Sequence, residues 1–465
     1  MPPAVSVPLH LDRFAGPSLA AQVAAQIRDL IGAHVLRAGD KLPSTRALAA
    51  DVHASRGVFE VAYDQLLAEG WLSTRHGAGT FVATHPGAAP RSRSVPPPVA
   101  DAAASPSAAR HTERRLLQLD TGTPWIDPRY RAWWRRAWRD VADAHPPTSY
   151  PEAAGLPELR AAIAAYVGRT RGIVTRPEQV MVTGGTTDGF NHLIAGLEAG
   201  SVAVEDPGYR AAAATVNALR HRLHDIPVDS HGADLLAYPI PADLRAVYVT
   251  PAHQHPTGAT MSAGRRVELV QACQSRGVLI VEDDYDSHFR YDVAPLPALR
   301  SLDERLVIHL GTASKIVMPG LRLGWLIGPE DMIAELSARR EATHDLAAWP
   351  TQRAFLTMLR EGYVDRLVRS ARRVYAARSE HLRTILAPFG QVTTPVAGMY
   401  LSLSLPAEQC ESVRRRAAEE GIEVPLLRDY TRSHPRQGLV IGFGGVIDAE
   451  FAHAADVLTN ALRLS

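Results

Sequence analysis

The chain of 465 residues contains few cysteines, few aromatic residues and no long hydrophobic run. Its two cysteines, Cys273 and Cys410, are too few for a disulfide framework, and no metal-ligand spacing surrounds them, so we expect a reducing cytoplasm and no metal site. No apolar run approaches the length of a membrane span, and the N-terminus lacks the basic-then-apolar pattern of a signal peptide. The sequence therefore predicts a soluble, cytoplasmic protein without a membrane partner.

An excess of charge of one sign is also missing. Lysine and arginine total 50, aspartate and glutamate total 49, and the net charge is +1. Any surface that binds nucleic acid must therefore be a local patch, because the whole chain carries no basic excess. The length indicates roughly two to four structural units.

The N-terminal segment has the periodicity of three helices followed by a hairpin. Ser44 is placed to cap a short second helix, and Ser55 is placed to cap a third. Two strand-like segments, 71–75 and 80–83, then flank a turn that contains glycine. The apolar face of the first helix recurs at spacings of three and four residues, at Leu19, Val23, Ile27, Leu30 and Ile31.

Two short helices joined by a tight turn are a common geometry for reading the major groove of DNA. Arg56, in the first turn of the third helix, could reach a guanine edge or a phosphate, and Arg46 could reach a phosphate. The hairpin tip would be a wing whose glycines let the backbone approach the minor groove. A three-helix protein-interaction module fits the spacing equally well. The candidate DNA-binding residues are Ser44, Arg46, Ser55, Arg56, His76, Gly77 and Gly79.

The amino-acid sequence of residues 16–84 resembles the winged helix-turn-helix domain of GntR-type regulators. This resemblance implies operator DNA as a partner. One departure is Gly57-Val58, where the family usually carries small polar residues after Ser-Arg, so the start of the helix should be less rigid. The segments that carry the resemblance are Gly39-Asp40-Lys41-Leu42-Pro43-Ser44-Thr45-Arg46, Ser55-Arg56, residues 63–72 and residues 77–82.

Residues 86–116 have a different composition, with six prolines, many alanines and serines, and no apolar periodicity. The segment contains five arginines but only two acidic residues. We interpret it as a linker that contains too little apolar material to fold alone. It is either a solvated tether or an additional contact to DNA phosphates.

From residue 117 to residue 465, short apolar runs alternate with helical stretches, which predicts an α/β domain with a mainly parallel sheet. Such sheets bind ligands at the carboxyl ends of their strands. Polar clusters do follow the predicted strands, at residues 183–186, 205–209, 250–251, 282–285 and 311–315.

Lys315 follows a buried strand in a turn rich in small polar residues, and a Schiff base to an aldehyde would remove its charge. Asp283 could pair with the pyridine nitrogen of such a cofactor, and Tyr285 could bond to its ring oxygen. Taken singly, Asp283 could instead be a helix cap, Tyr209 a core aromatic and Arg322 a surface charge. The other candidates are Tyr209 for stacking on the ring, and Gly185, Thr186, Ser314 and Arg322 for the phosphate.

Together these residues resemble the fold-type I enzymes that depend on pyridoxal 5′-phosphate (PLP), and more closely the aminotransferase-like domain of the MocR subfamily of GntR regulators. The resemblance implies PLP as cofactor and a homodimer, which the linker would allow to be domain-swapped. It also implies that Tyr150 reaches the cofactor phosphate of the partner subunit. The tryptophan-rich stretch at residues 133–138 matches nothing that we can place. The resemblance rests on Tyr150 and on residues 155–160, 183–186, 205–209, 250–258, 282–286, 314–315 and 320–324.

Two departures affect catalysis. His255 stands where aminotransferases carry the asparagine that tunes the ring oxygen, and Val440 stands where many carry an arginine for the substrate carboxylate. Another arginine would have to bind a carboxylate, and the departures predict weak or absent transaminase activity. The candidates for that arginine are Arg210, Arg428, Arg432 and Arg436.

Three functions remain open. The chain could be a transcription regulator that responds to PLP or to an amino-group effector. It could instead be an aminotransferase with an appended DNA-binding domain, or a regulator that has lost the cofactor. Retention of Lys315, Asp283, Tyr285 and Arg322 argues against the third reading.

Overall fold

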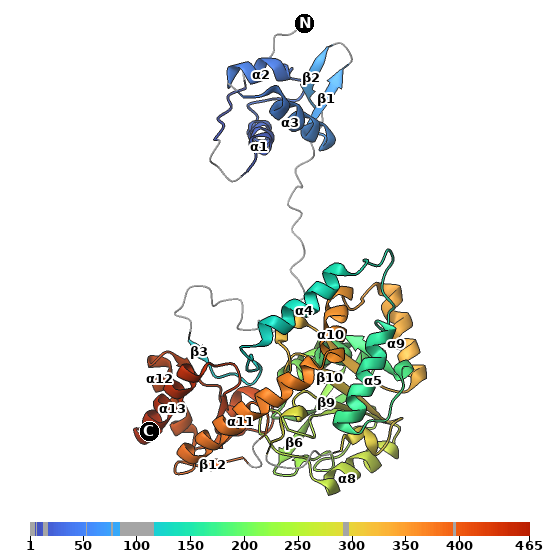
Figure 1. Cartoon of the computed structure of the whole chain (residues 1–465), viewed down its shortest axis with the longest axis vertical. Coiled ribbons are helices and arrows are strands. Elements are labelled where there is room, and N and C mark those ends of the chain that lie inside the picture. The colour runs from blue at the N-terminus through green and yellow to red at the C-terminus, as the bar shows by residue number, and fades with distance from the viewer. Residues whose placement is uncertain are drawn as a thin grey trace. The chain divides into compact units, whose positions relative to one another are not determined.

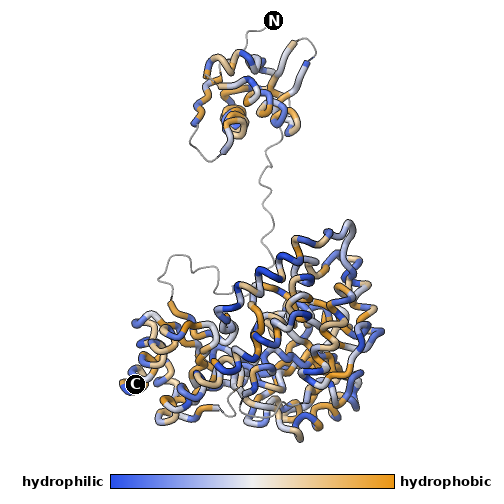
Figure 2. The backbone as a smooth tube through the Cα atoms, viewed as in Figure 1, coloured by the Kyte–Doolittle hydropathy of each residue, from blue (hydrophilic) through white to orange (hydrophobic). Residues whose placement is uncertain are grey.

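The computed structural model describes residues 5, 7–12, 17–52, 54–75, 78–83, 116–291, 297–393 and 397–465. The chain divides into two compact units, Met1–Ser105 and Pro106–Ser465. The expected linker lies outside the described residues except for Leu116, and His76 and Gly77 of the expected wing also lie outside them. In both units hydrophobic and hydrophilic residues alternate along the helices (Figure 2).

The first unit contains three helices and a hairpin (Figure 1). Ser44 Oγ caps the second helix by accepting a hydrogen bond from the Ala47 amide at 3.2 Å, as predicted, whereas Ser55 stands at the cap of the third helix without a side-chain bond. The helices bury a shared core that includes Ile27, Phe59 and Leu66. The elements are α1 (Leu19–Gly32), α2 (Thr45–Asp51), α3 (Arg56–Ala68), β1 (Leu72–Arg75) and β2 (Gly79–Val82).

The second unit is built on an eight-stranded sheet in the order β4-β11-β10-β9-β8-β5-β6-β7. Neighbours from β10 to β6 run parallel, while β11 runs antiparallel to both β10 and β4, and β7 runs antiparallel to β6. The predicted mainly parallel sheet is therefore confirmed. The strands are β4 (Val180–Thr183), β5 (Ser201–Asp206), β6 (Arg222–Asp229), β7 (Gly232–Ala233), β8 (Leu244–Val249), β9 (Leu279–Asp284), β10 (Val307–Thr312) and β11 (Gly324–Ile327).

Helices cover both faces of this sheet, because alternate strand residues are buried on opposite sides. Met181, Tyr248 and Val281 share one buried cluster with α6 (Thr186–Ile194), α7 (Arg210–Ala218) and α9 (Glu330–Thr343). Val180, Val247 and their alternating neighbours pack on the opposite side. The helices there are α5 (Pro157–Arg171), α8 (Ala263–Gln274) and α10 (Trp349–Arg360).

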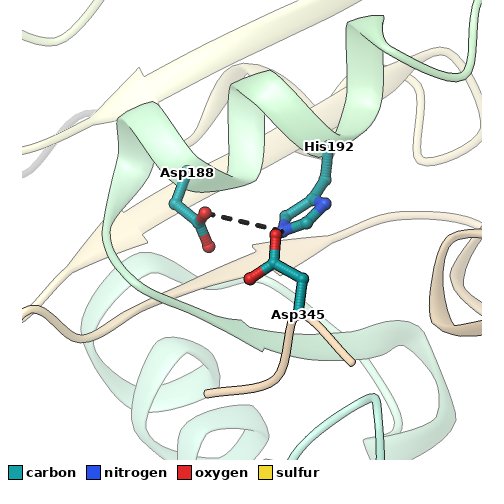
Figure 3. A group of neighbouring side chains, drawn as sticks. All are labelled: Asp188, His192 and Asp345. Atoms are coloured by element: carbon teal, nitrogen blue, oxygen red, sulfur yellow. Dashed lines mark ion pairs between the residues drawn. The ribbon is translucent and has the colours of Figure 1, made fainter. Parts of the chain in front are cut away.

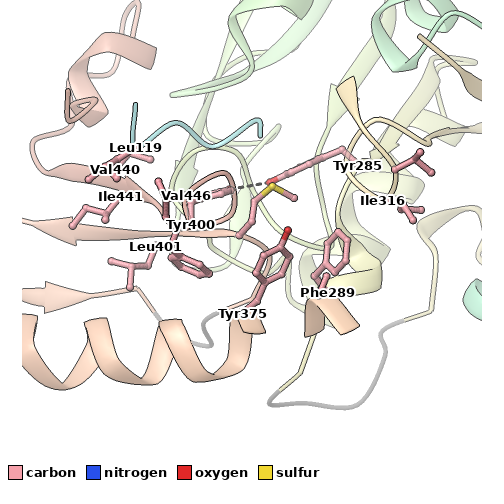
Figure 4. Packing of buried hydrophobic residues seen from close by; sticks show 14 of the residues in the cluster. Leu119, Tyr285, Phe289, Ile316, Tyr375, Tyr400, Leu401, Val440, Ile441 and Val446 are labelled. Atoms are coloured by element: carbon pink, nitrogen blue, oxygen red, sulfur yellow. Dashed lines mark hydrogen bonds between the residues drawn. The ribbon is translucent and has the colours of Figure 1, made fainter. Parts of the chain in front are cut away.

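The C-terminal part adds a small antiparallel sheet, and Figure 4 shows Leu119 packed beside Val440 and Ile441 of that sheet. The strand β3 (Leu117–Gln118) pairs with β14 (Ile422–Glu423), so the two ends of this unit meet. The helix α4 (Tyr130–Asp143) packs mainly on α10. The remaining elements are β12 (Gln391–Val392), β13 (Tyr400–Ser404), β15 (Leu439–Gly442), α11 (Tyr363–Leu386), α12 (Ala407–Glu419) and α13 (Asp448–Arg463). Among the described helices, none is long and apolar enough to span a membrane.

Candidate cofactor site and DNA-binding surface

A cavity of about 330 Å³ opens at the edge of the large sheet where the parallel strands end. The antiparallel strand β11 begins at this edge, so the residues just before it also reach the cavity. Every predicted cofactor residue except Tyr150 lines it. The lining residues are Asp120, Thr121, Gly122, Gly185, Thr186, Thr187, Tyr209, Arg210, Thr250, His255, Asp283, Tyr285, Thr312, Ser314, Lys315, Pro319, Arg322 and Tyr430.

The side chain of Lys315 points into this cavity and donates a hydrogen bond from Nζ to the carbonyl oxygen of Gly122 at 2.8 Å. Burial lowers the pKa of the Lys315 ammonium, and the charges of Asp120, Asp286 and Asp283 only partly oppose this effect. A lowered pKa increases the fraction of free amine, which is the form that attacks an aldehyde.

Asp283 is the last but one residue of β9 and lies on the same face of the sheet as Tyr248, which donates its hydroxyl hydrogen to Oδ2 of Asp283. The other oxygen, Oδ1, is buried and accepts no hydrogen bond from any residue that the structure describes. Burial raises the pKa of this carboxyl to about 7, against the opposing effects of Tyr248 and Thr186. A buried acceptor without a donor costs free energy, so a protonated pyridine nitrogen in the cavity fits this position.

The start of α6 forms a cradle for an anion. Gly185 precedes the helix with φ +123°, and a Cβ atom there would lie 3.6 Å from the guanidinium of Arg322. The guanidinium of Arg322 makes no hydrogen bond or ion pair with a described residue, and Ser314 lines the same cavity. Free amides at a helix start together with a guanidinium suit a phosphate group.

Aromatic rings surround the remainder of the cavity. Tyr209 lies edge-on to His255, with ring centroids 5.8 Å apart, and its hydroxyl is 3.2 Å from that of Thr187. Burial, followed by the charge of Lys315, lowers the pKa of His255 to about 3, so this imidazole is neutral at physiological pH. The neutral ring can act as a hydrogen-bond partner for a polar ligand atom without carrying a positive charge.

The hydroxyl of Tyr285 is already bonded within the protein. It donates to the carbonyl oxygen of His253 at 2.9 Å and lies 2.8 Å from the hydroxyl of Tyr400 (Figure 4). His253 in turn places Nδ1 2.6 Å from a carboxylate oxygen of Asp286, and both side chains are buried. The predicted bond from Tyr285 to a cofactor ring oxygen would therefore start from a hydroxyl held by this buried network.

Of the four arginines considered for a ligand carboxylate, Arg210 alone lines the cavity. Its guanidinium lies 5.0 Å above the ring of Tyr430 and forms no ion pair with a described residue. The other three lie outside the lining and are engaged elsewhere, which corrects the sequence-based candidates. Arg428 is paired with Glu411, Arg432 with Asp225 and Arg436 with the carbonyl oxygen of Val228.

Tyr150 lies outside the cavity of its own chain, and its side chain is 72% exposed. Its ring stacks on His344, with centroids 4.7 Å apart. This position leaves the tyrosine free to act on a partner subunit, which stays a prediction.

The side chains of Asp188, His192 and Asp345 lie between the anion cradle and the segment on which Tyr150 stacks (Figure 3). His192 Nε2 lies 3.5 Å from a carboxylate oxygen of Asp188 and 3.5 Å from one of Asp345. Asp345 follows His344, while Asp188 accepts the amide hydrogen of Gly184 at 2.8 Å. These ion pairs therefore link the turn at the start of α6 to the segment on which Tyr150 stacks.

The sequence analysis did not assign several lining residues to the cofactor site. Tyr248, which holds Asp283 from outside the lining, could have been found once β8 and β9 are known to be neighbours, because it pairs with Val281, two residues before Asp283 on the same face of the sheet. Asp120, Thr121 and Gly122 reach the cavity because Leu119 is bonded to Gly442 in the C-terminal part, a pairing without a local signal. The other lining residues that were not assigned are Thr187, Thr250, Thr312, Pro319 and Tyr430.

In the first unit, Ser44, Arg46, Ser55 and Arg56 are all exposed, as a DNA-binding surface requires. Arg56 is paired with Glu60 one turn later at 2.8 Å, so it must leave this ion pair to contact DNA. The hydroxyl of Tyr63 donates to the carbonyl oxygen of Pro43 at 2.9 Å and fixes α3 against the preceding turn. Gly79 is exposed at the hairpin with φ +111°.

Comparisons with known proteins match both units. Residues 19–82 match the family of bacterial regulatory proteins of the gntR family, and residues 118–436 match aminotransferase class I and II. The chain is 34% identical to the HTH-type pyridoxine biosynthesis transcriptional regulator PdxR of Corynebacterium glutamicum, over 94% of each chain. It is 32% identical to the probable rhizopine catabolism regulatory protein MocR of Rhizobium meliloti, over 94% of this chain and 92% of that protein.

Among solved structures, an archaeal alanine:glyoxylate aminotransferase superposes with a TM-score of 0.68 at 24% identity, covering 75% of this chain and 91% of that one. This match confirms the predicted fold-type I architecture of the second unit. The full-length matches and the two family matches agree with the resemblance seen in the sequence. The chain belongs to the MocR subfamily of GntR-type transcription regulators, in which a winged helix-turn-helix is joined to a PLP-binding, aminotransferase-like domain.

Proposed function

We propose that this chain regulates transcription by holding PLP covalently on Lys315 and by responding to PLP itself or to an amino compound that replaces Lys315 on the cofactor. The observation that carries the proposal is the buried, unpaired Oδ1 of Asp283 in the cavity that also contains Lys315. An unpaired acceptor beside a largely buried amine is what a pyridine aldehyde would satisfy.

Different residues around the cavity would bind different parts of the cofactor. When bound, PLP supplies an aldehyde that bonds to amines and a ring that withdraws electrons. Asp283 would hold the proton on the ring nitrogen, and Tyr209 would pack on the ring face. His255 and Tyr285 would lie near the ring oxygen, while Gly185, Thr186, Ser314 and Arg322 would bind the phosphate.

A regulator is favoured over an aminotransferase with an appended DNA-binding domain, because the two full-length relatives are named as regulators. Retention of Lys315, Asp283 and Arg322 around one cavity is the observation that favours residual transaminase chemistry. Turnover of amino donors with a 2-oxoacid, compared between the wild-type chain and Lys315→Ala, measures that activity. We expect weak or no turnover, since neutral His255 and apolar Val440 replace the residues that aminotransferases use.

We further propose that the protein acts in the cytoplasm as a homodimer on double-stranded operator DNA. Two-fold operators match two-fold proteins, and the exposed Tyr150 has no role in the cavity of its own chain. The 31-residue linker of positions 86–116 is long enough to exchange the winged domains between the two subunits of this dimer.

A promoter-binding assay tests this proposal. Fragments of the DNA upstream of the gene for this chain are titrated with cofactor-free protein, with protein plus PLP, and with PLP plus a mixture of amino acids. We expect PLP or the amino compound to change the affinity of the wild-type chain several-fold and to leave Lys315→Ala unaffected. DNA binding that is identical in all arms would contradict the effector role.

A further inference from the structure

The tryptophan-rich segment that the sequence left unplaced is one face of the amphipathic helix α4. Trp134, Trp138 and Val141 pack against the core of the second unit, and Ala137 is fully buried. Trp133 stacks on Tyr363 of α11, with ring centroids 5.6 Å apart. The aromatic face therefore fixes the rotation of α4 on the domain.

The opposite face of α4 carries arginines at every fourth position. Arg131, Arg135 and Arg139, which we call the α4 arginine stripe, are exposed, and their guanidinium groups form no hydrogen bond or ion pair with a described residue. Successive positions four apart lie on one side of a helix, and eight residues of helix rise about 12 Å. Figure 2 shows the hydrophilic residues along this helix.

Neighbouring carboxylates do not neutralise the stripe. Asp140 is paired with Arg353 at 2.8 Å, and its pKa is lowered by that bond first and by the charge of Arg136 to a smaller extent. Asp143 lies one turn beyond Arg139, at the end of the helix. The linker sequence of residues 86–116 is itself basic, so it supplies no compensating charge.

Arginines that stand four residues apart on a helix repel one another by a few tenths of a kcal/mol per pair. A bound polyanion would relieve this repulsion. Duplex DNA carries about one phosphate charge per 1.7 Å of its axis, so several phosphates face a stripe of this length. The chain belongs to a family of DNA-binding regulators, and DNA is therefore the polyanion that it meets.

We propose that the α4 arginine stripe is a second DNA-binding surface, which contacts phosphates outside the base pairs read by the winged helix. Contacts to phosphates are independent of sequence and add affinity rather than specificity. None of the three arginines lines the cofactor cavity or belongs to the recognition helix. The proposed contact between the stripe and DNA does not depend on whether PLP or an amino compound is the effector.

The test is the salt dependence of binding to a 60-base-pair duplex of mixed sequence, measured with the full-length protein loaded with PLP. The triple variant Arg131→Gln, Arg135→Gln and Arg139→Gln should reduce the magnitude of the negative slope of log affinity against log salt by about 2 to 3 for each stripe on the duplex, since each phosphate contact contributes about 0.9. The triple lysine variant should keep the wild-type slope. An unchanged visible absorption of the bound cofactor shows that each variant is folded.

A charge-matched control separates local contacts from net charge. Arg305→Gln, Arg415→Gln and Arg463→Gln remove three exposed arginines that have no ion pair with a described residue and lie away from α4. A slope that falls equally in this control overturns the proposal, as does an unchanged slope in the stripe variant or a wild-type chain that does not bind the duplex. Loss of the dimer in the stripe variant with an unchanged slope would instead assign the stripe to a second copy of the chain.

Discussion

Lys315 donates its hydrogen bond to the carbonyl oxygen of Gly122, in a loop whose amides are held by the carboxylate of Asp120. The loop lies just beyond β3, so the cofactor lysine is bonded to the first segment of its unit. A lysine bonded covalently to an aldehyde no longer carries an ammonium group. Cofactor binding should therefore weaken this contact between Lys315 and the loop.

The first prediction concerns the lysine itself. Lys315→Ala should abolish covalent cofactor binding, because the structure places no other lysine in the lining of the cavity among the residues it describes. The purified variant should lack the visible absorption of the wild-type protein and should keep its secondary structure, since one hydrogen bond is lost. Reduction with borohydride followed by mass spectrometry is the measurement. A PLP adduct on another lysine of the variant would contradict the assignment.

The second prediction concerns the pH dependence of the cofactor-free protein. Burial raises the pKa of Asp283 from its ordinary value near 4 to about 7, so the folded state binds a proton more tightly than the unfolded state does. Stability from this group is present below about pH 4 and is lost as the pH rises through about 7. Between these two pH values, the free energy of unfolding should fall by about 1.4 kcal/mol for each pH unit through this group.

Thermal unfolding of the cofactor-free chain and of Asp283→Asn at pH 5 and pH 7.5 measures this effect. The asparagine cannot ionise, so the variant should lose less stability over this range than the wild type. Glu205→Gln should show an effect of the same sign, because burial also raises the pKa of Glu205 to about 7, although its hydrogen bonds come from Thr250 and Gln254. Equal loss of stability in Asp283→Asn and wild type would show that Asp283 is already ionised.

The sequence predicted the centre of the site because its residues follow buried strands. Asp283 lies near the carboxyl end of its strand, and Lys315 and Gly185 follow their strands within three residues, at positions that such a sheet brings to one edge. Arg322 precedes β11 instead, and reaches the same edge only because that strand is antiparallel. The position of Arg322 at this site could be predicted from the family resemblance, but not from the alternation of strands and helices.

Other features depend on pairings between segments far apart in the sequence. The strand β6, next to the edge strand β7, was not predicted, because Arg222–Asp229 mixes charged and apolar residues, as expected for a strand that is only partly buried. The hydrogen bond between Tyr248 and Asp283 requires β8 and β9 to be neighbours. The buried pair of His253 and Asp286 joins a loop after β8 to a residue after β9, and nothing local in either segment indicates it.

The third prediction concerns the recognition helix. Arg56→Ala should weaken specific DNA binding at least several-fold, because a good base contact from arginine contributes about 1–3 kcal/mol. The ion pair with Glu60 is exposed at both ends, so breaking it on binding should cost little. Operator affinity at fixed salt is the measurement, and the cofactor absorption should be unchanged. Affinity equal to wild type would show that α3 is not the helix that reads DNA.

The fourth prediction concerns Arg210, the unpaired guanidinium in the cavity. Arg210→Gln should weaken the spectral response to alanine by roughly tenfold, because a hydrogen bond to a charged group contributes about 1.5–3 kcal/mol. The response to ethylamine, which has no carboxylate, should be unchanged. Arg436→Gln is a matched control outside the cavity lining, since Arg436 is bonded to Val228. Equal weakening with alanine and ethylamine would argue against a carboxylate site.

The fifth prediction is that Tyr150 completes the cofactor site of the neighbouring subunit. The ring of Tyr150 is held by its stack on His344, and the ion pairs of His192 fix the segment that carries His344. Tyr150→Phe should therefore weaken retention of PLP during dialysis while leaving the fold of the unit intact. Light scattering at micromolar concentration should show a dimer. A monomer that retains PLP and binds its full operator would contradict this prediction.

Mixing two defective subunits tests the direction of this contact. If Tyr150 acts across the interface, a dimer of Tyr150→Phe with Lys315→Ala has one site with both defects and one site with neither. The second site combines the intact Lys315 of one subunit with the intact Tyr150 of the other, so PLP that resists dialysis and is reducible by borohydride should reappear on mixing. If Tyr150 acts within its own chain, every site keeps one defect and no such PLP appears. Each variant mixed with itself is the control, because neither homodimer contains an intact pair.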